Sequence, residues 1–102
     1  MIVVMGTIEL AEGDIDRLQG AMAKQMAETQ AEDGCQQYIF SRDVTNPNRL
    51  LISEHWRDGE ALAAHGKTPH MAEFNKAIAS ATIKAISVKA YEVAGVRVLL
   101  GE

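Results

Sequence analysis

The chain has 102 residues, of which 47% are hydrophobic and 24% charged, and its formal net charge at pH 7 is -4. This length predicts a single domain over residues 1–102, and the composition is typical of a globular protein rather than a disordered or fibrous one. The Lys and Arg residues are scattered, which argues against a nucleic-acid or anionic-membrane partner. The longest apolar run, residues 1–5, is too short to span a bilayer and no export segment is visible, so we expect a cytoplasmic protein.

The first two predicted elements are a strand and a helix. Residues 2–10 are rich in β-branched side chains and read as a strand. Residues 14–32 then change to a helical period, with Ile15, Leu18, Met22 and Met26 on one face. We expect Asp14 to cap this helix and Gly34 to end it.

A hairpin follows. Residues 35–43 form the second predicted strand, with Tyr38 and Phe40 on the same side, and residues 49–56 form the third. The turn-forming stretch VTNPN, residues 44–48, joins the two strands and makes the pair antiparallel.

The last third predicts two short helices and a strand. Asp58 and Gly66 bracket the first helix, and Thr68 with Pro69 begins the second. Residues 83–93 read as the fourth strand and are followed by an apolar tail. The order strand, helix, strand, strand, helix, strand predicts an α+β, ferredoxin-like βαββαβ fold with a four-stranded antiparallel sheet.

Both faces of this sheet carry apolar side chains, but two helices cover only one face. Val3, Met5 and Leu51 lie on the second face, and the tail residues 96–102 have no cover of their own. An exposed apolar face of this kind marks an interface. We therefore expect a homodimer in which two sheets pack face to face and the tail reaches over the partner.

The stretch EHWRDGEALAAHGKTPHMAEF, residues 54–74, holds all three histidines and the only tryptophan. Strand alternation puts Glu54 and Trp56 on one face and His55 on the other. His65 lies in the last turn of one helix and His70 in the first turn of the next, so the two rings flank a bend and can approach one another.

The spacing of these histidines does not favour a metal site, because His65 and His70 straddle a helix break and His55 faces away. The sequence also has no nucleophile elbow, phosphate loop or dinucleotide fingerprint. Cys35 reads as a small buried side chain rather than a reactive thiol.

Two interpretations of the stretch remain. In one, Trp56, Tyr38, Phe40 and Phe74 wall a pocket for a flat phenolic ligand whose ionisation a histidine assists. In the other, the two histidines bond backbone groups at the helix junction while Trp56 and Phe74 belong to the core.

The segment EDGCQQYIFSRDVTNPNRLLISEHWRDGEALAAHGKTPHMAEF, residues 32–74, resembles the antibiotic biosynthesis monooxygenase domain. Its marks are a Gly-Cys start of the second strand, an Asn-Pro turn, Glu-x-Trp, and two histidines, and the likeness extends over nearly the whole chain. The resemblance implies the dimeric α/β-barrel form of the ferredoxin-like fold.

The resemblance also implies a cofactor-free monooxygenase that oxidises a quinol, anthrone or similar phenol with dioxygen, without flavin, haem or metal. It implies His65 as the base or hydrogen-bond partner, His70 as the second choice, and Trp56, Tyr38 and Phe74 as walls, with Phe40 and Glu54 beside them.

Two related activities fit the sequence less well. A haem-degrading branch uses an Asn on the first strand, where this chain has Gly6 and Thr7, and its iron-binding His falls near Phe74. A branch that acts on a phosphorylated signalling sugar would need basic groups at the pocket, and these are dispersed. A dimeric binding or sensing module without catalysis stays open as the alternative.

Overall fold

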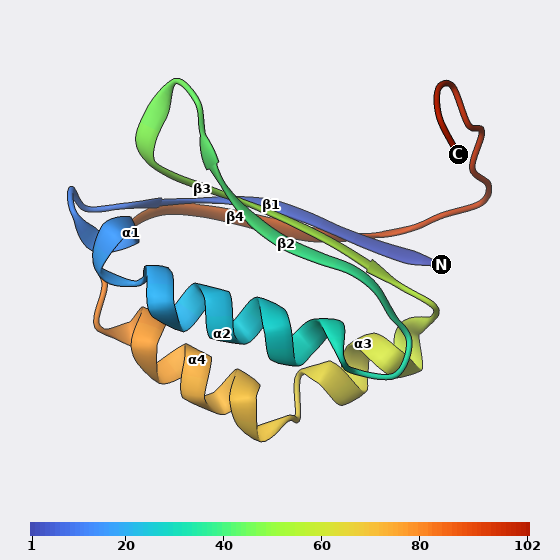
Figure 1. Ribbon diagram of the computed structural model, residues 1–102, viewed down its shortest axis with the longest axis horizontal. Coiled ribbons are helices and arrows are strands. Elements are labelled where there is room, and N and C mark those ends of the chain that lie inside the picture. Colours follow the sequence, from blue (N-terminus) through green and yellow to red (C-terminus); the bar gives the residue numbers. More distant parts are fainter.

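The computed structural model describes all residues 1–102, and its eight elements form one sheet and one helical layer (Figure 1). The elements are β1 (Ile2–Leu10), α1 (Asp14–Arg17), α2 (Gln19–Gln30), β2 (Cys35–Asp43), β3 (Asn46–Trp56), α3 (Gly59–His65), α4 (Pro69–Ala79) and β4 (Ile83–Glu92). The strands are antiparallel in the order β2-β3-β1-β4, and the helices lie on one face of the sheet. This confirms the predicted ferredoxin-like α+β fold.

The first helical segment is shorter and less regular than predicted. It breaks at Leu18, and α2 ends at Gln30 with Ala31 as its C-cap. Gly34 does not end the helix: its φ of 83° shapes the turn into β2, because a left-handed backbone suits glycine. The early end of α2 leaves Glu32 in a turn rather than on the helix surface.

The prediction that Asp14 caps the helix is wrong. Gly13 occupies the N-cap position and Asp14 is the first helical residue. The Asp14 carboxylate instead accepts hydrogen bonds from the Thr82 backbone N–H at 3.0 Å and from Arg17. It therefore ties α1 to the segment that precedes β4.

The hairpin turn is tighter than the predicted VTNPN loop. Asp43 pairs with Asn46, so only Val44 and Thr45 form the turn, and Asp43 Oδ1 accepts from the Thr45 N–H at 2.8 Å. Pro47 lies within β3, beyond the residues that pair with β1 and at a shift in the β2 register. A proline is tolerated there because no regular ladder hydrogen bond needs its nitrogen.

The two short helices begin where predicted. Asp58 Oδ1 accepts from the Ala61 N–H at 2.9 Å, and Thr68 Oγ1 accepts from the Met71 N–H at 3.2 Å. Pro69 is the first residue of α4. The Thr68 cap, together with Pro69, fixes the bend between the two histidines because α4 then starts anew after α3 has ended at His65.

The core lies between the helices and the inner face of the sheet. Its two clusters comprise Ile8, Leu10, Ile15, Leu18, Met22 and Leu50, and Val4, Tyr38, Trp56 and Ala61. The inward side chains alternate with outward ones along each strand, as strand geometry requires. No helix of the structure has the length and apolar character that crossing a membrane requires.

The opposite face of the sheet, here called the outer face, is uncovered. Met5, Ile39, Leu51 and Tyr91 point outward there and are 55%, 43%, 37% and 49% exposed. The tail beyond β4 leaves the sheet without packing on the helices (Figure 1), and Leu99 and Leu100 are largely exposed. The predicted apolar outer face is therefore present, and the dimer stays a prediction.

Candidate active site

Three side chains meet where the end of α2, the end of α3 and the start of α4 come together. His65 Nδ1 lies 2.7 Å from Glu32 Oε2, and His70 Nε2 lies 2.8 Å from the same oxygen. The side chains of His65, Glu32 and His70 are 5%, 13% and 16% exposed. The two histidines thus share one largely buried carboxylate.

Local structure brings this triad together. His65 is the last residue of α3 and His70 the second of α4, and Thr68 Oγ1 donates to the His65 carbonyl at 2.9 Å across the bend. Glu32 is presented by the turn that Gly34 shapes. A Cβ at Gly34 would lie 2.5 Å from the Ala61 Cβ, so this turn packs closely against α3.

The tautomers of the two rings follow from their shared partner. An ionised carboxylate only accepts hydrogen bonds, so the ring nitrogen that faces Glu32 carries the hydrogen in each histidine. A neutral His65 then has an unprotonated Nε2, and a neutral His70 has an unprotonated Nδ1. In His70 this Nδ1 lies 3.6 Å from Glu28 Oε2, which is beyond hydrogen-bond distance, so Glu28 does not require a hydrogen there.

The distances within the triad favour shared protons over a metal ion. The three candidate ligand atoms lie within 4.8 Å of one another. A tetrahedral zinc with bonds of about 2.0–2.1 Å would hold its ligand atoms about 3.3–3.4 Å apart. The contacts of 2.7 and 2.8 Å to Glu32 Oε2 are shorter than that and match charge-assisted hydrogen bonds.

An aromatic layer fills the space beneath the triad. The His65 ring centroid is 4.8 Å from that of Trp56 and 5.3 Å from that of Tyr38. Trp56 is fully buried, and its Nε1 donates to Glu54 Oε1 at 2.9 Å. Burial raises the pKa of the Tyr38 hydroxyl and the pKa of the Glu54 carboxyl. For Glu54, the hydrogen bond from Trp56 lowers the pKa and so offsets part of this rise.

The raised pKa of Glu54 predicts a pH-dependent stability. The folded state binds the Glu54 proton more tightly than the unfolded state, whose pKa is near the ordinary 4.5. This contribution is complete below that value and is lost as the pH rises through the folded pKa. Glu54→Gln keeps an acceptor for Trp56 and carries no charge. We expect its melting temperature to match wild type at pH values below 4.5 and to exceed it increasingly as the pH rises above that value.

Thermal unfolding followed by circular dichroism across this pH range measures the effect. Glu12→Gln, at an exposed position, is the matched control, and its melting temperature should follow wild type throughout. A Glu54→Gln curve parallel to wild type at every pH would mean that burial does not penalise the Glu54 charge.

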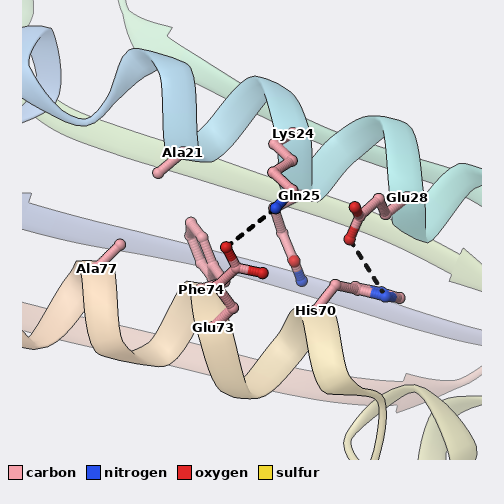
Figure 2. Close-up of a pocket in the computed structure, with 8 residues that line it drawn as sticks. All are labelled: Ala21, Lys24, Gln25, Glu28, His70, Glu73, Phe74 and Ala77. Carbon is pink, nitrogen blue, oxygen red and sulfur yellow. Dashed lines mark hydrogen bonds and ion pairs between the residues drawn. The ribbon is translucent and has the colours of Figure 1, made fainter.

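A pocket opens between α2 and α4, next to the triad (Figure 2). Its volume is about 90 Å³, and it is lined by Ala21, Lys24, Gln25, Glu28, His70, Glu73, Phe74 and Ala77. Lys24 Nζ bonds Glu73 Oε1 at 3.0 Å and so links the two helices across the pocket. Phe74 forms an apolar wall and stacks on Phe40, with ring centroids 5.4 Å apart.

A separate shallow depression lies beside Glu32. It is lined by Glu32, Asp33, Arg57, Glu60, Ala61, Ala64 and Thr68, and shares no residue with the α2–α4 pocket.

Residues 1–77 match the family model described as antibiotic biosynthesis monooxygenase, abbreviated ABM. The chain belongs to the ABM family. It is 30% identical to the uncharacterized protein sll1783 of Synechocystis over 96% of this chain and 67% of that protein.

Solved structures agree with this assignment. A Deinococcus radiodurans protein assigned to the same family superposes with a TM-score of 0.89 and 26% identity, over 99% of this chain and 100% of that one. A Nitrosomonas europaea protein, also assigned to it, has a TM-score of 0.85 over 93% of this chain and 100% of that one, at 16% identity. The second likeness shows the shared fold.

In this ABM protein, the site residues predicted from the sequence fall into two groups, one that lines the pocket and one that is buried beneath it. His70 and Phe74 line the pocket. His65, Trp56, Tyr38 and Glu54 are buried and do not line it, and Phe40 lies behind Phe74. The expected cavity beside His65 and Trp56 is filled by the aromatic layer.

The structure also shows what the two site histidines bond and where His55 points. The histidine side chains bond Glu32 rather than the backbone groups expected at the helix junction. His55 points to the outer face beside Gln37, away from the triad, as strand alternation predicts.

Sequence reasoning missed Glu32, Gln25 and Glu28. The sequence does hold a signal for Gln25. Gln25 lies three residues after Met22 on the predicted apolar face of the helix, where a polar side chain is unusual and indicates a specific role. Glu32 has no comparable signal, because its position depends on where α2 ends.

Proposed function

We propose that this ABM protein is a cofactor-free monooxygenase that oxidises a quinol or similar phenol with dioxygen in the α2–α4 pocket. The observation that carries the proposal is His70, which lines the pocket while Glu32 holds its Nε2–H. A carboxylate that binds one imidazole nitrogen orients the ring and fixes its tautomer. His70 Nδ1 is then the base that accepts the phenolic proton.

The chemistry needs no bound redox group. A phenolate is electron-rich enough to pass an electron to dioxygen, so the protein has to bind, deprotonate and shield the substrate. For a quinol, one oxygen atom of O₂ enters the ring and the other leaves as water with the two hydrogens that the substrate loses. Atoms and electrons balance without an external reductant or a metal.

The size of the pocket favours a substrate with one ring. Its volume of about 90 Å³ is well below the roughly 300–1,000 Å³ of pockets for drug-sized ligands. A three-ring anthrone would have to separate α2 from α4 and break the Lys24–Glu73 ion pair. Among the substrate classes that the family resemblance implies, we therefore favour monocyclic quinols.

Oxygen uptake by EDTA-treated protein tests the proposal. We expect uptake with monocyclic hydroquinones, one O₂ consumed for each ring oxygenated, slower uptake with anthrones, and no loss of rate from EDTA. Loss of activity with EDTA that zinc or iron restores would contradict a metal-free mechanism. Ligand-induced thermal stabilisation without any uptake would favour the binding or sensing module.

The charges around the pocket disfavour a phosphorylated sugar substrate. Lys24 is the only cation in the pocket lining, and Glu73 is paired with it, while Glu28 adds a negative charge. Arg42 and Arg57 are held elsewhere by Asp16 and Asp33. A phosphate group would thus meet no free cation there, whereas a neutral phenol meets no such difficulty.

We also propose that the protein is a homodimer whose outer faces pack together, with the tail 96–102 on the partner subunit. Support comes from the exposed apolar side chains of the outer face and tail, since a stable interface buries on the order of 800 Å² per partner. We expect light scattering at micromolar concentration to give the mass of a dimer, and Met5→Asp to give that of a monomer.

The control for this experiment is Val44→Asp in the fully exposed hairpin turn, which should remain dimeric. A monomeric wild-type protein would contradict the proposal, as would a Met5→Asp variant that is folded and still dimeric.

A further inference from the structure

We propose that Gln25 selects the ligand of the α2–α4 pocket: its Oε1 accepts a hydrogen bond from a ligand hydroxyl, so the site prefers a hydroxylated ring to an isosteric ring without a donor. This inference rests on the proposed function for the location of the site. Beyond the proposed oxidation, the inference assigns a role to Gln25 and a preference of the pocket for hydroxylated rings, here called the recognition rule.

The Gln25 side chain is buried and incompletely bonded. Gln25 is 2% exposed, and its Nε2 donates to Met71 Sδ at 3.2 Å and lies 3.5 Å from the Tyr38 hydroxyl. Its Oε1 is the one buried side-chain polar atom without a hydrogen-bond partner. A buried acceptor left unpaired costs free energy, so an orphan of this kind calls for an explanation.

The contact with Met71 favours the orientation in which Nε2 faces the sulfur, and the Tyr38 hydroxyl is compatible with it because a hydroxyl accepts as well as donates. A thioether sulfur only accepts, so it attracts the amide N–H groups and repels the amide oxygen. Rotating the amide to exchange its two ends would place Oε1 against the sulfur. The unpaired atom is therefore an acceptor, and the missing partner is a donor.

The position of Gln25 ties this acceptor to the pocket. Gln25 lines the pocket, and Figure 2 shows its side chain running from α2 into the space between the helices, with its amide between Phe74 and His70. A ring against Phe74 would thus have the His70 base on one side and the Gln25 amide beside it. Because Oε1 itself is shielded in the unliganded protein, the amide has to turn toward the ligand for its oxygen to accept. The hydroxyl of the ring supplies the missing donor, whereas a methyl group or a quinone carbonyl does not.

The magnitude of the preference follows from the same reasoning. A site built around a substrate hydroxyl discriminates strongly against the analogue that lacks it, because the buried polar group is then left unpaired. We expect at least a tenfold effect, which corresponds to about 1.4 kcal/mol.

The test is anaerobic binding, so that no turnover occurs, measured by calorimetry with hydroquinone and with p-xylene, in which methyl groups replace both hydroxyls. In Gln25→Met, a side chain of similar length has no acceptor oxygen. The hydroquinone-to-xylene affinity ratio should be at least tenfold higher in wild type than in Gln25→Met. Lys76→Met, at an exposed position of α4 outside the pocket lining, should keep the wild-type ratio.

Thermal unfolding checks that Gln25→Met is folded, and Gln25→Leu serves if it is not. Equal ratios in wild type and variant, or no detectable binding of either probe to wild type, would overturn the inference. The two proposals fail separately. Selective anaerobic binding without oxygen uptake would remove the monooxygenase and leave the recognition rule, while uptake with an unchanged ratio in Gln25→Met would remove the rule alone.

Discussion

Replacing His70 with alanine is expected to lower kcat/KM for quinol oxidation by about 10²–10⁴-fold, the usual contribution of a positioned general base. His70 is the only histidine that lines the pocket, and its Nε2 is held by Glu32. Removing the ring leaves the phenolic proton without the imidazole nitrogen proposed to accept it. Initial rates of oxygen uptake, measured for the folded variant, give the fold-change.

Two further histidine variants make the result specific. His55→Ala should leave the rate unchanged, because His55 lies on the outer face of the sheet. His65→Ala should cost less than His70→Ala, because His65 bonds the same Glu32 oxygen but does not reach the pocket lining. A larger loss for His65 than for His70 would reinstate His65 as the base.

The second large effect concerns stability. Trp56→Ala is expected to lower the free energy of unfolding by about 3–5 kcal/mol, the usual cost of removing a buried aromatic side chain. Trp56 is fully buried and packs with Tyr38 and Val4, and its loss also leaves the Glu54 carboxylate without its donor. A small domain has only about 5–15 kcal/mol in total, so the variant should be near its folding limit.

Urea unfolding measures this change, with Val44→Ala at a fully exposed position as the control, for which we expect a change within about 0.5 kcal/mol. The same experiment separates the two roles that Trp56 was given. Replacing a core residue lowers the free energy of unfolding strongly. Replacing a pocket wall would instead raise KM and change the free energy of unfolding little. The structure places Trp56 beneath the pocket, so we expect the first outcome.

The fold was predictable because each of its signals is local. The change from a period of two to a period of 3.6 separates β1 from α2, and the side chains of Asp58 and Thr68 determine where α3 and α4 begin. Where local signals compete, the prediction erred. Asp14 suits an N-cap, but Gly13 takes that position and the Asp14 carboxylate reaches Thr82, 68 residues further on.

The site was predictable only in part, because it depends on distances between elements. Spacing indicates that His65 and His70 flank a bend, but it does not tell that Glu32 lies between them. Nor does it give the separation of α2 and α4, which puts the opening beside His70 and Phe74 and leaves Trp56 and Tyr38 packed below. Alternation assigns a side chain to a face of the sheet, and it does not distinguish a cavity wall from a filled core on that face.

Glu32 lies between the α2–α4 pocket, which it contacts through His70, and a second depression on the surface. On one side Glu32 Oε2 accepts from His70, which faces the pocket, and on the other Glu32 lines the depression that shares no residue with that pocket. A proton that His70 takes up at Nδ1 can be passed on from Nε2 to the Glu32 carboxylate and released to solvent there. In the proposed oxidation, the phenolic proton therefore has a route to bulk water through Glu32 that does not pass through the substrate pocket.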